Sequence, residues 1–123
     1  MIPANEKSAL TLLAWFYMKQ GFPVRASRLY QALVAVDPDD PAHARGLAAA
    51  HLAAGHADRA LAALDQLALR GAIDGPYHAF RARALAALGR QDEAAAAMRA
   101  YVDYRTIPGP APTAAPGRDT RER

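Results

Sequence analysis

The chain contains no cysteine, which excludes disulfides, thiolate metal sites and cysteine nucleophiles. Only 7% of its 123 residues are aromatic, whereas 52% are hydrophobic, and alanine dominates that hydrophobic set. An alanine side chain buries little area, and burial contributes roughly 25 cal/mol per Å² of apolar surface. We therefore expect one small, marginally stable domain that gains stability from a partner.

The chain also has little excess charge. It carries 15 Lys and Arg against 12 Asp and Glu, for a net charge of +3. Part of this excess lies in the last six residues, "RDTRER". Because a nucleic-acid site needs a concentrated basic patch, we expect no nucleic-acid partner.

No hydrophobic run is long enough to cross a bilayer. The longest candidate, "ALTLLAWFYM" (Ala9 to Met18), is far shorter than the ~20 residues a membrane-spanning helix requires. It is also a poor signal sequence, because Glu6 precedes it and "KQGFP" after it offers no small-residue cleavage site. We interpret it as a buried helix face and expect a cytoplasmic protein without membrane insertion.

Residues that carry chemistry are scarce and scattered. Serine occurs only at Ser8 and Ser27, and no glycine-rich phosphate loop is present. The histidines are His43, His51, His56 and His78, and none forms the i, i+4 pairing with a nearby acid that is typical of zinc sites. We predict no catalytic residue, no cofactor and no metal, and hence no enzyme.

Two features could still be functional. His51 is read as a packed residue in preference to a ligand. The acidic cluster of Asp37, Asp39 and Asp40 is read as turn and helix-cap chemistry.

The strongest positive signal is a repeat with a period of 34 residues. Gly21, Gly55 and Gly89 recur at this spacing. Two sets of alanines keep the same step, namely Ala14, Ala48 and Ala82, and Ala26, Ala60 and Ala94. The alanine composition inflates the alanine matches but not the glycine matches.

Local signals predict six helices, over 6–20, 24–36, 41–54, 57–69, 76–88 and 91–105. Asp40 followed by Pro41 is typical of an N-cap with proline at the first helical position. Four prolines between Pro108 and Pro116 mark a change in composition, so residues 107–123 are predicted to be a disordered tail.

A period of 34 residues with these glycines and alanines resembles the tetratricopeptide repeat (TPR), a helix–turn–helix unit. The resemblance implies an all-α, right-handed superhelix of three repeats with six antiparallel helices. It places the repeats at about 7–40, 41–74 and 75–106, in one domain over 1–106. Pro38 closes the first repeat as in the family, but Ala72 and Thr106 stand at the equivalent later positions.

In this family the first helix of each repeat lines a concave groove that binds other proteins. Carried over to this chain, the predicted groove consists of Thr11, Trp15, Met18, Lys19, Arg45, Ala49, Leu52, Ala53, Ala79, Arg83 and Ala86. Thr11 and Trp15 stand where chaperone-binding TPR proteins place a lysine and an asparagine that clamp a carboxylate. The groove is therefore predicted to be apolar, with Trp15 and Met18 as anchors and arginines at its edge.

Other interpretations of these side chains remain open. Trp15 could instead fill the N-terminal end of the core. Arg45 and Arg83 could be ordinary solvated charges on helix faces.

Several phrases resemble the small TPR chaperones of bacterial type III secretion, of the YscY (SctY) type. These phrases are "LLAWFYMKQG" (Leu12 to Gly21), "ALVAVDP" (Ala32 to Pro38) and "AYVDY" (Ala100 to Tyr104). The resemblance implies a cytosolic chaperone that binds a small, helical, YscX-like export client as a heterodimer and docks at the export gate protein. Without its client, such a chaperone would self-associate.

Two alternatives are kept. One is a needle-subunit or translocator chaperone of the same secretion systems. The other is a generic TPR scaffold with several protein partners.

Overall fold

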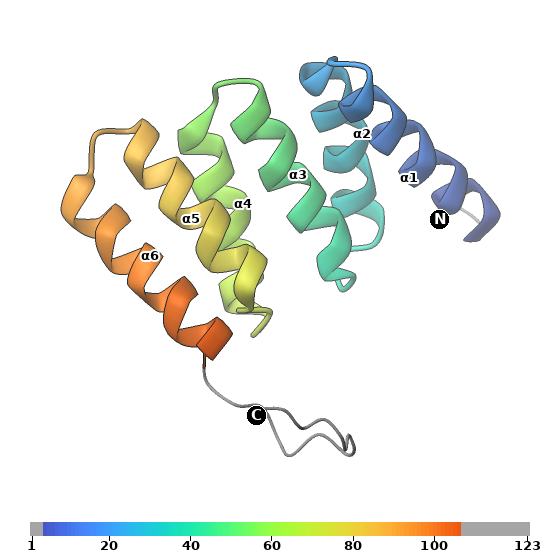
Figure 1. Ribbon diagram of the computed structural model, residues 1–123. Helices are drawn as coiled ribbons and strands as arrows, with labels where there is room; N and C mark the ends of the chain where they lie inside the picture. The colour runs from blue at the N-terminus through green and yellow to red at the C-terminus, as the bar shows by residue number, and fades with distance from the viewer. Residues whose placement is uncertain (1–3, 107–123) are drawn as a thin grey trace, which may run out of the picture.

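The computed structural model describes residues 4–106, which form six helices and no strand. The helices are α1 (Ala4–Lys19), α2 (Pro23–Val36), α3 (Pro41–Ala53), α4 (Ala57–Leu69), α5 (Gly75–Ala87) and α6 (Gln91–Thr106). They follow one another across the molecule from α1 to α6 (Figure 1). The prediction of an all-α fold with three stacked helical hairpins is confirmed. The predicted tail, residues 107–123, lies outside the described residues.

Glycines end four of the helices in the same way. Gly21, Gly55, Gly71 and Gly89 have φ between +75° and +84°, a left-handed conformation that only glycine adopts easily. At each of these ends the amide after the glycine donates to a carbonyl five residues back, as Phe22 does to Tyr17 over 2.8 Å. The three glycines of the repeat therefore end α1, α3 and α5, as the sequence predicts.

Aspartates begin two of the helices. The Asp40 carboxylate accepts a hydrogen bond from the Ala42 amide (2.9 Å) at the start of α3, and Asp74 accepts one from the Tyr77 amide (3.0 Å) at the start of α5. These bonds satisfy amides that have no partner within the helix. The predicted Asp40 cap is confirmed, and the fifth helix begins one residue before Pro76.

Alanines allow the helices to approach one another. The two repeating sets, Ala14, Ala48 and Ala82, and Ala26, Ala60 and Ala94, are all buried. Only four large side chains are fully buried, namely Leu33, Leu64, Leu67 and Leu85. The core of the described residues is thus built from many small contacts and a few leucines.

Each helix packs mainly on the helix that follows it, and α3 also contacts α5. Within residues 4–106, no helix has the length and apolar character required to cross a membrane.

His51 is packed, as predicted, and is only 8% exposed near the end of α3. Burial lowers the pKa of its imidazole, and the positive charges of Arg59 and His56 lower it further, whereas Asp58 acts in the opposite direction. The Nδ1 atom is buried without a hydrogen-bond partner among the described residues. A neutral ring is favoured because burying the charged form is costly.

We expect a ¹H–¹⁵N NMR titration to give His51 a pKa below about 6.5, the usual value. Arg59→Gln should raise this pKa and Asp58→Asn should lower it further. As the pH falls through 6.5 the unfolded chain takes up the proton first, so the His51 contribution to stability is present at higher pH and lost in acid. A wild-type pKa at or above 6.5 would contradict this account.

Candidate functional site

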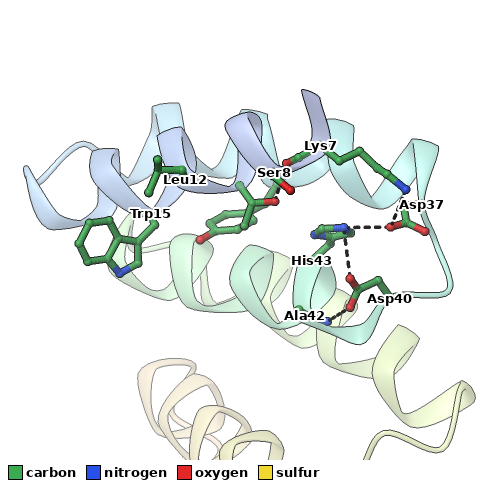
Figure 2. A pocket seen from close by; sticks show the side chains of 10 residues that line it. Lys7, Ser8, Leu12, Trp15, Asp37, Asp40, Ala42 and His43 are labelled. Atoms are coloured by element: carbon green, nitrogen blue, oxygen red, sulfur yellow. Dashed lines mark hydrogen bonds and ion pairs between the residues drawn. The ribbon is translucent and has the colours of Figure 1, made fainter. Parts of the chain in front are cut away.

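A hollow of about 700 Å³ lies between α1 and the start of α3 (Figure 2). We call it the α1–α3 hollow. It is lined by Lys7, Ser8, Thr11, Leu12, Trp15, Tyr30, Asp37, Asp40, Ala42 and His43. Its residues come from α1, from α2 and from the link into α3, so that neighbouring hairpins form it together.

One end of the hollow is apolar and accessible. Trp15 is 51% exposed and Leu12 is 65% exposed, although both are large hydrophobic residues. The buried ring of Tyr30 lies between them and α3, and the Lys19 ammonium lies 5.5 Å from the centre of the Trp15 ring. Large apolar side chains exposed beside a hollow are typical of a surface that another molecule covers.

Tyr30 fits here because α3 has a glycine opposite it. A Cβ atom on Gly46 would lie well inside van der Waals contact with the Cδ1, Cε1 and Cζ atoms of the Tyr30 ring. The glycine thus lets the ring sit directly on the α3 backbone and line the hollow. Burial also raises the pKa of the Tyr30 hydroxyl.

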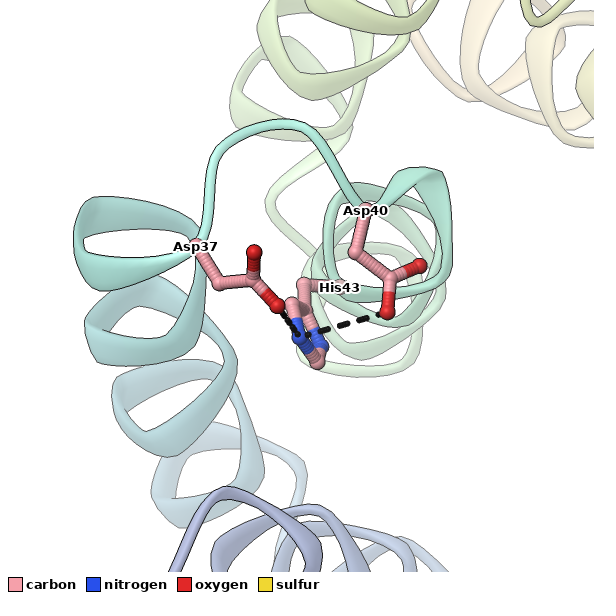
Figure 3. A group of neighbouring side chains, drawn as sticks. All are labelled: Asp37, Asp40 and His43. Carbon is pink, nitrogen blue, oxygen red and sulfur yellow. Dashed lines mark hydrogen bonds and ion pairs between the residues drawn. The ribbon is translucent and has the colours of Figure 1, made fainter. Parts of the chain in front are cut away.

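The other end of the hollow is polar (Figures 2 and 3). The Nε2 atom of buried His43 lies 3.2 Å from Asp37 Oδ2 and 3.6 Å from Asp40 Oδ2. The Lys7 ammonium reaches Asp37 Oδ2 from α1 at 3.5 Å. These contacts join α1, the α2–α3 link and α3 at one point.

Asp37, Asp40 and His43 are also the group of potential metal ligands found in residues 4–106, with ligand atoms within 4.8 Å of one another. Two features argue against a cation there. Lys7 already balances the charge of Asp37, and the N-terminus of α3, which carries partial positive charge, repels cations. The turn-and-cap interpretation of the acidic residues fits this geometry, and Asp39 forms an ion pair with Arg70 at 2.6 Å.

The predicted groove residues lie on α1, α3 and α5, the first helix of each hairpin. On α1, Thr11 and Trp15 line the hollow, Lys19 lies over Trp15, and Met18 packs partly into the core. Trp15 therefore does not fill the end of the core, which was the alternative interpretation. The Thr11 hydroxyl donates to the Lys7 carbonyl over 2.8 Å, within α1.

The predicted residues on α3 and α5 are less uniform. Arg45 forms an ion pair of 2.8 Å with Asp74, the residue that caps α5, so it connects the second hairpin to the third. Leu52 is half-buried and packs partly into the core, whereas Ala53 and Ala86 are exposed. Ala49 and Ala79 are half-buried, and the Arg83 guanidinium lies 5.9 Å from the Phe80 ring. Their role in binding stays a prediction.

Sequence reasoning missed Leu12, Tyr30 and the polar end of the hollow. A signal for Tyr30 was present, since it is the large residue of the repeat that faces a glycine 16 positions later. No sequence signal indicates that Lys7, Asp37 and His43 meet, because they come from three different elements.

Comparison with protein families matches residues 17–84 to the tetratricopeptide repeat. The match extends from the end of α1 into α5 and covers more than half of the chain. No curated protein matches the chain.

Proposed function

The chain belongs to the tetratricopeptide-repeat family, and from that premise we propose that its α1–α3–α5 side binds a helical or extended segment of another protein. Proteins of this family are typically non-enzymatic scaffolds for protein–protein interaction. The observation that carries the proposal is the α1–α3 hollow, which combines an exposed Trp15 and Leu12 with a polar end formed by Lys7, Asp37 and His43.

The chemistry of the hollow indicates what would fit it. An apolar side chain of the partner would cover Trp15 and Leu12, and each Å² of apolar surface removed from water contributes roughly 25 cal/mol. Polar groups next to that side chain would meet the ionic cluster of Lys7, Asp37 and Asp40. An amphipathic helix carries both kinds of group on neighbouring faces, and this supports a helical partner.

More specifically, we propose a cytosolic chaperone of type III secretion that holds a small, YscX-like export client and delivers it to the export gate. The support is the resemblance of "LLAWFYMKQG", "ALVAVDP" and "AYVDY" to that class, together with the exposed apolar side chains of α1. Its action would be physical, since it would cover apolar client surface until the client is released. A needle-subunit or translocator chaperone, or a general scaffold, would use the same surface.

The proposal is tested by co-expression with a YscX-like protein. We expect a soluble one-to-one complex and a blue shift of tryptophan fluorescence, because Trp15 is the only tryptophan of the chain. Trp15→Ala should weaken the complex by about tenfold or more in calorimetry, since buried tryptophans are typical binding hot spots worth about 2 kcal/mol.

The matched control is Phe22→Ala. Phe22 is about as exposed as Trp15, but it lies in the α1–α2 turn and contacts Tyr17 and Arg25. Its replacement should leave the affinity unchanged. Equal affinity of wild type and Trp15→Ala, with circular dichroism showing both folded, would mean that the partner binds elsewhere. If the YscX-like protein does not bind, the specific chaperone function is wrong and a scaffold for other proteins is favoured.

A further inference from the structure

The 34-residue period shows which side of α1 lacks a neighbour. In α3 and α5 the positions that face the preceding hairpin are His43 and Tyr77, Gly46 and Phe80, and Ala50 and Ala84. His43, Tyr77, Ala50 and Ala84 are buried, and Gly46 lies under Tyr30 of α2. In both hairpins, therefore, a helix of the preceding hairpin covers this side, α2 over α3 and α4 over α5.

The equivalent positions of α1 are Ala9, Leu12 and Phe16, and all of them are exposed. Leu12 is 65% exposed and Phe16 is 48% exposed, and Leu13 beside them is exposed as well. These residues, which we call the α1 stripe, follow the i, i+3, i+4, i+7 spacing of one helix face. Ala14, on the other side of the helix, is fully buried against the rest of the protein. Thus α1 is apolar on two sides, and the stripe has the character of a surface that receives a helix.

We propose that α1 of a second copy of this chain covers the stripe, as an antiparallel pair of helices related by a two-fold axis. The sizes of the side chains support this pairing. With the axis between Leu12 and Leu13, the small Ala9 of each copy lies opposite the large Phe16 of the other. The leucines of the two copies meet at the centre. Such an interface closes on itself, as two-fold dimers do.

The charges along α1 favour the same direction. Glu6 lies in the first turn and Lys19 in the last turn. An antiparallel pair places the first turn of each helix beside the last turn of the other, so acidic and basic ends become neighbours and the helix dipoles oppose each other. Among residues 4–106, Glu6 has no ion-pair partner within its own chain.

The other occupant to consider is α6 of a second copy, which would continue the stack head to tail. The equivalents of Tyr30 and Val34 on α6 are Met98 and Val102, and both are about half exposed. This face offers fewer large side chains than the stripe, and head-to-tail contacts generate open chains of molecules instead of a closed dimer.

The absence of cysteine allows a direct test of the two-fold pairing. Leu12→Cys places one thiol per copy next to the proposed axis. In dilute protein with copper phenanthroline and air as oxidant, we expect covalent dimers to form at least about tenfold faster than for Leu69→Cys, because a docked thiol has a high effective concentration. Leu69 is the matched control, since it is 80% exposed on α4, away from the stripe.

Light scattering provides the second measurement. We expect the wild-type chain to have twice its monomer mass of 13.1 kDa, and Phe16→Glu to be a monomer with unchanged helicity. A monomeric wild type, or cross-linking of Leu12→Cys no faster than that of Leu69→Cys, would overturn the proposal. Rapid cross-linking only in a mixture of Leu12→Cys and Met98→Cys would replace it with the head-to-tail arrangement.

These outcomes are separate from the proposed client binding. Phe16→Glu removes the dimer but changes no residue that lines the hollow, so a folded Phe16→Glu monomer should still bind the client. Trp15→Ala should show the reverse, with the dimer retained and client binding weakened.

Discussion

Leu64→Ala is expected to lower the free energy of unfolding by about 2–5 kcal/mol, a large part of the total for a domain of this size. Leu64 is completely buried in α4 and belongs to the cluster that joins the first two hairpins to Tyr77 of the third. Because most of its neighbours in the core are alanines and lie on packed helices, they cannot fill the space that the substitution leaves. Few other side chains of this size are fully buried, so the loss is not shared.

The measurement is urea denaturation followed by circular dichroism at 222 nm. Leu69→Ala is the matched control, because it makes the same change five residues later in α4 at a site that is 80% exposed. It should alter stability by no more than about 0.5 kcal/mol, as is usual for surface substitutions. Similar losses for the two variants would show that α4 is not packed as described.

Gly46→Phe is expected to lower the free energy of unfolding by about 3 kcal/mol, at the upper end of the range for overpacked cores. Any side chain at this position collides with the Tyr30 ring, which lies directly on the α3 backbone. The ring is buried and cannot move outward without leaving the contact between α2 and α3. The same displacement would fill or distort the α1–α3 hollow, so partner binding should weaken too.

A second substitution should relieve this collision. Tyr30 and Gly46 are equivalent, 34 residues later, to Leu64 and Phe80, which belong to the same packed region. Combining Tyr30→Leu with Gly46→Phe therefore installs the residue pair that the chain already uses between its second and third hairpins. The double variant should be more stable than the sum of the single losses predicts, by about 0.5–3 kcal/mol in a double-mutant cycle. Simple additivity would contradict the proposed contact.

The sequence predicted the helices well because their ends depend on local chemistry. Gly21, Gly55 and Gly89 end helices through their positive φ angles, and Asp40 caps a helix with its own side chain. Such features act within four or five residues, so the repeat displays them directly.

The α4–α5 link illustrates both the strength and the limit of the repeat. Ala72 replaces the expected proline, yet α4 still ends at a left-handed glycine, Gly71, and Asp74 caps the next helix. The turn chemistry is thus supplied by residues at other positions. A template taken from the first repeat alone would have missed this substitution of one device for another.

The site was less predictable, because it depends on distances between hairpins. The predicted groove contained Trp15 and Thr11, but the hollow beside them exists because Tyr30 lies on Gly46 and because Lys7 reaches Asp37. Arg45 was predicted at the edge of the groove, and its pairing with Asp74 could not be inferred from spacing within one repeat. These contacts join residues that are far apart in the sequence.

The helices of the described region touch their chain neighbours almost exclusively. Forming these contacts requires only short loops to close, which limits the entropy lost on folding and favours rapid folding. This economy explains how a core rich in alanine is sufficient. It also allows a hairpin at either end to open while the middle one stays folded. A polypeptide bound along α1 would therefore slow amide hydrogen exchange in the part of the chain that otherwise opens most readily.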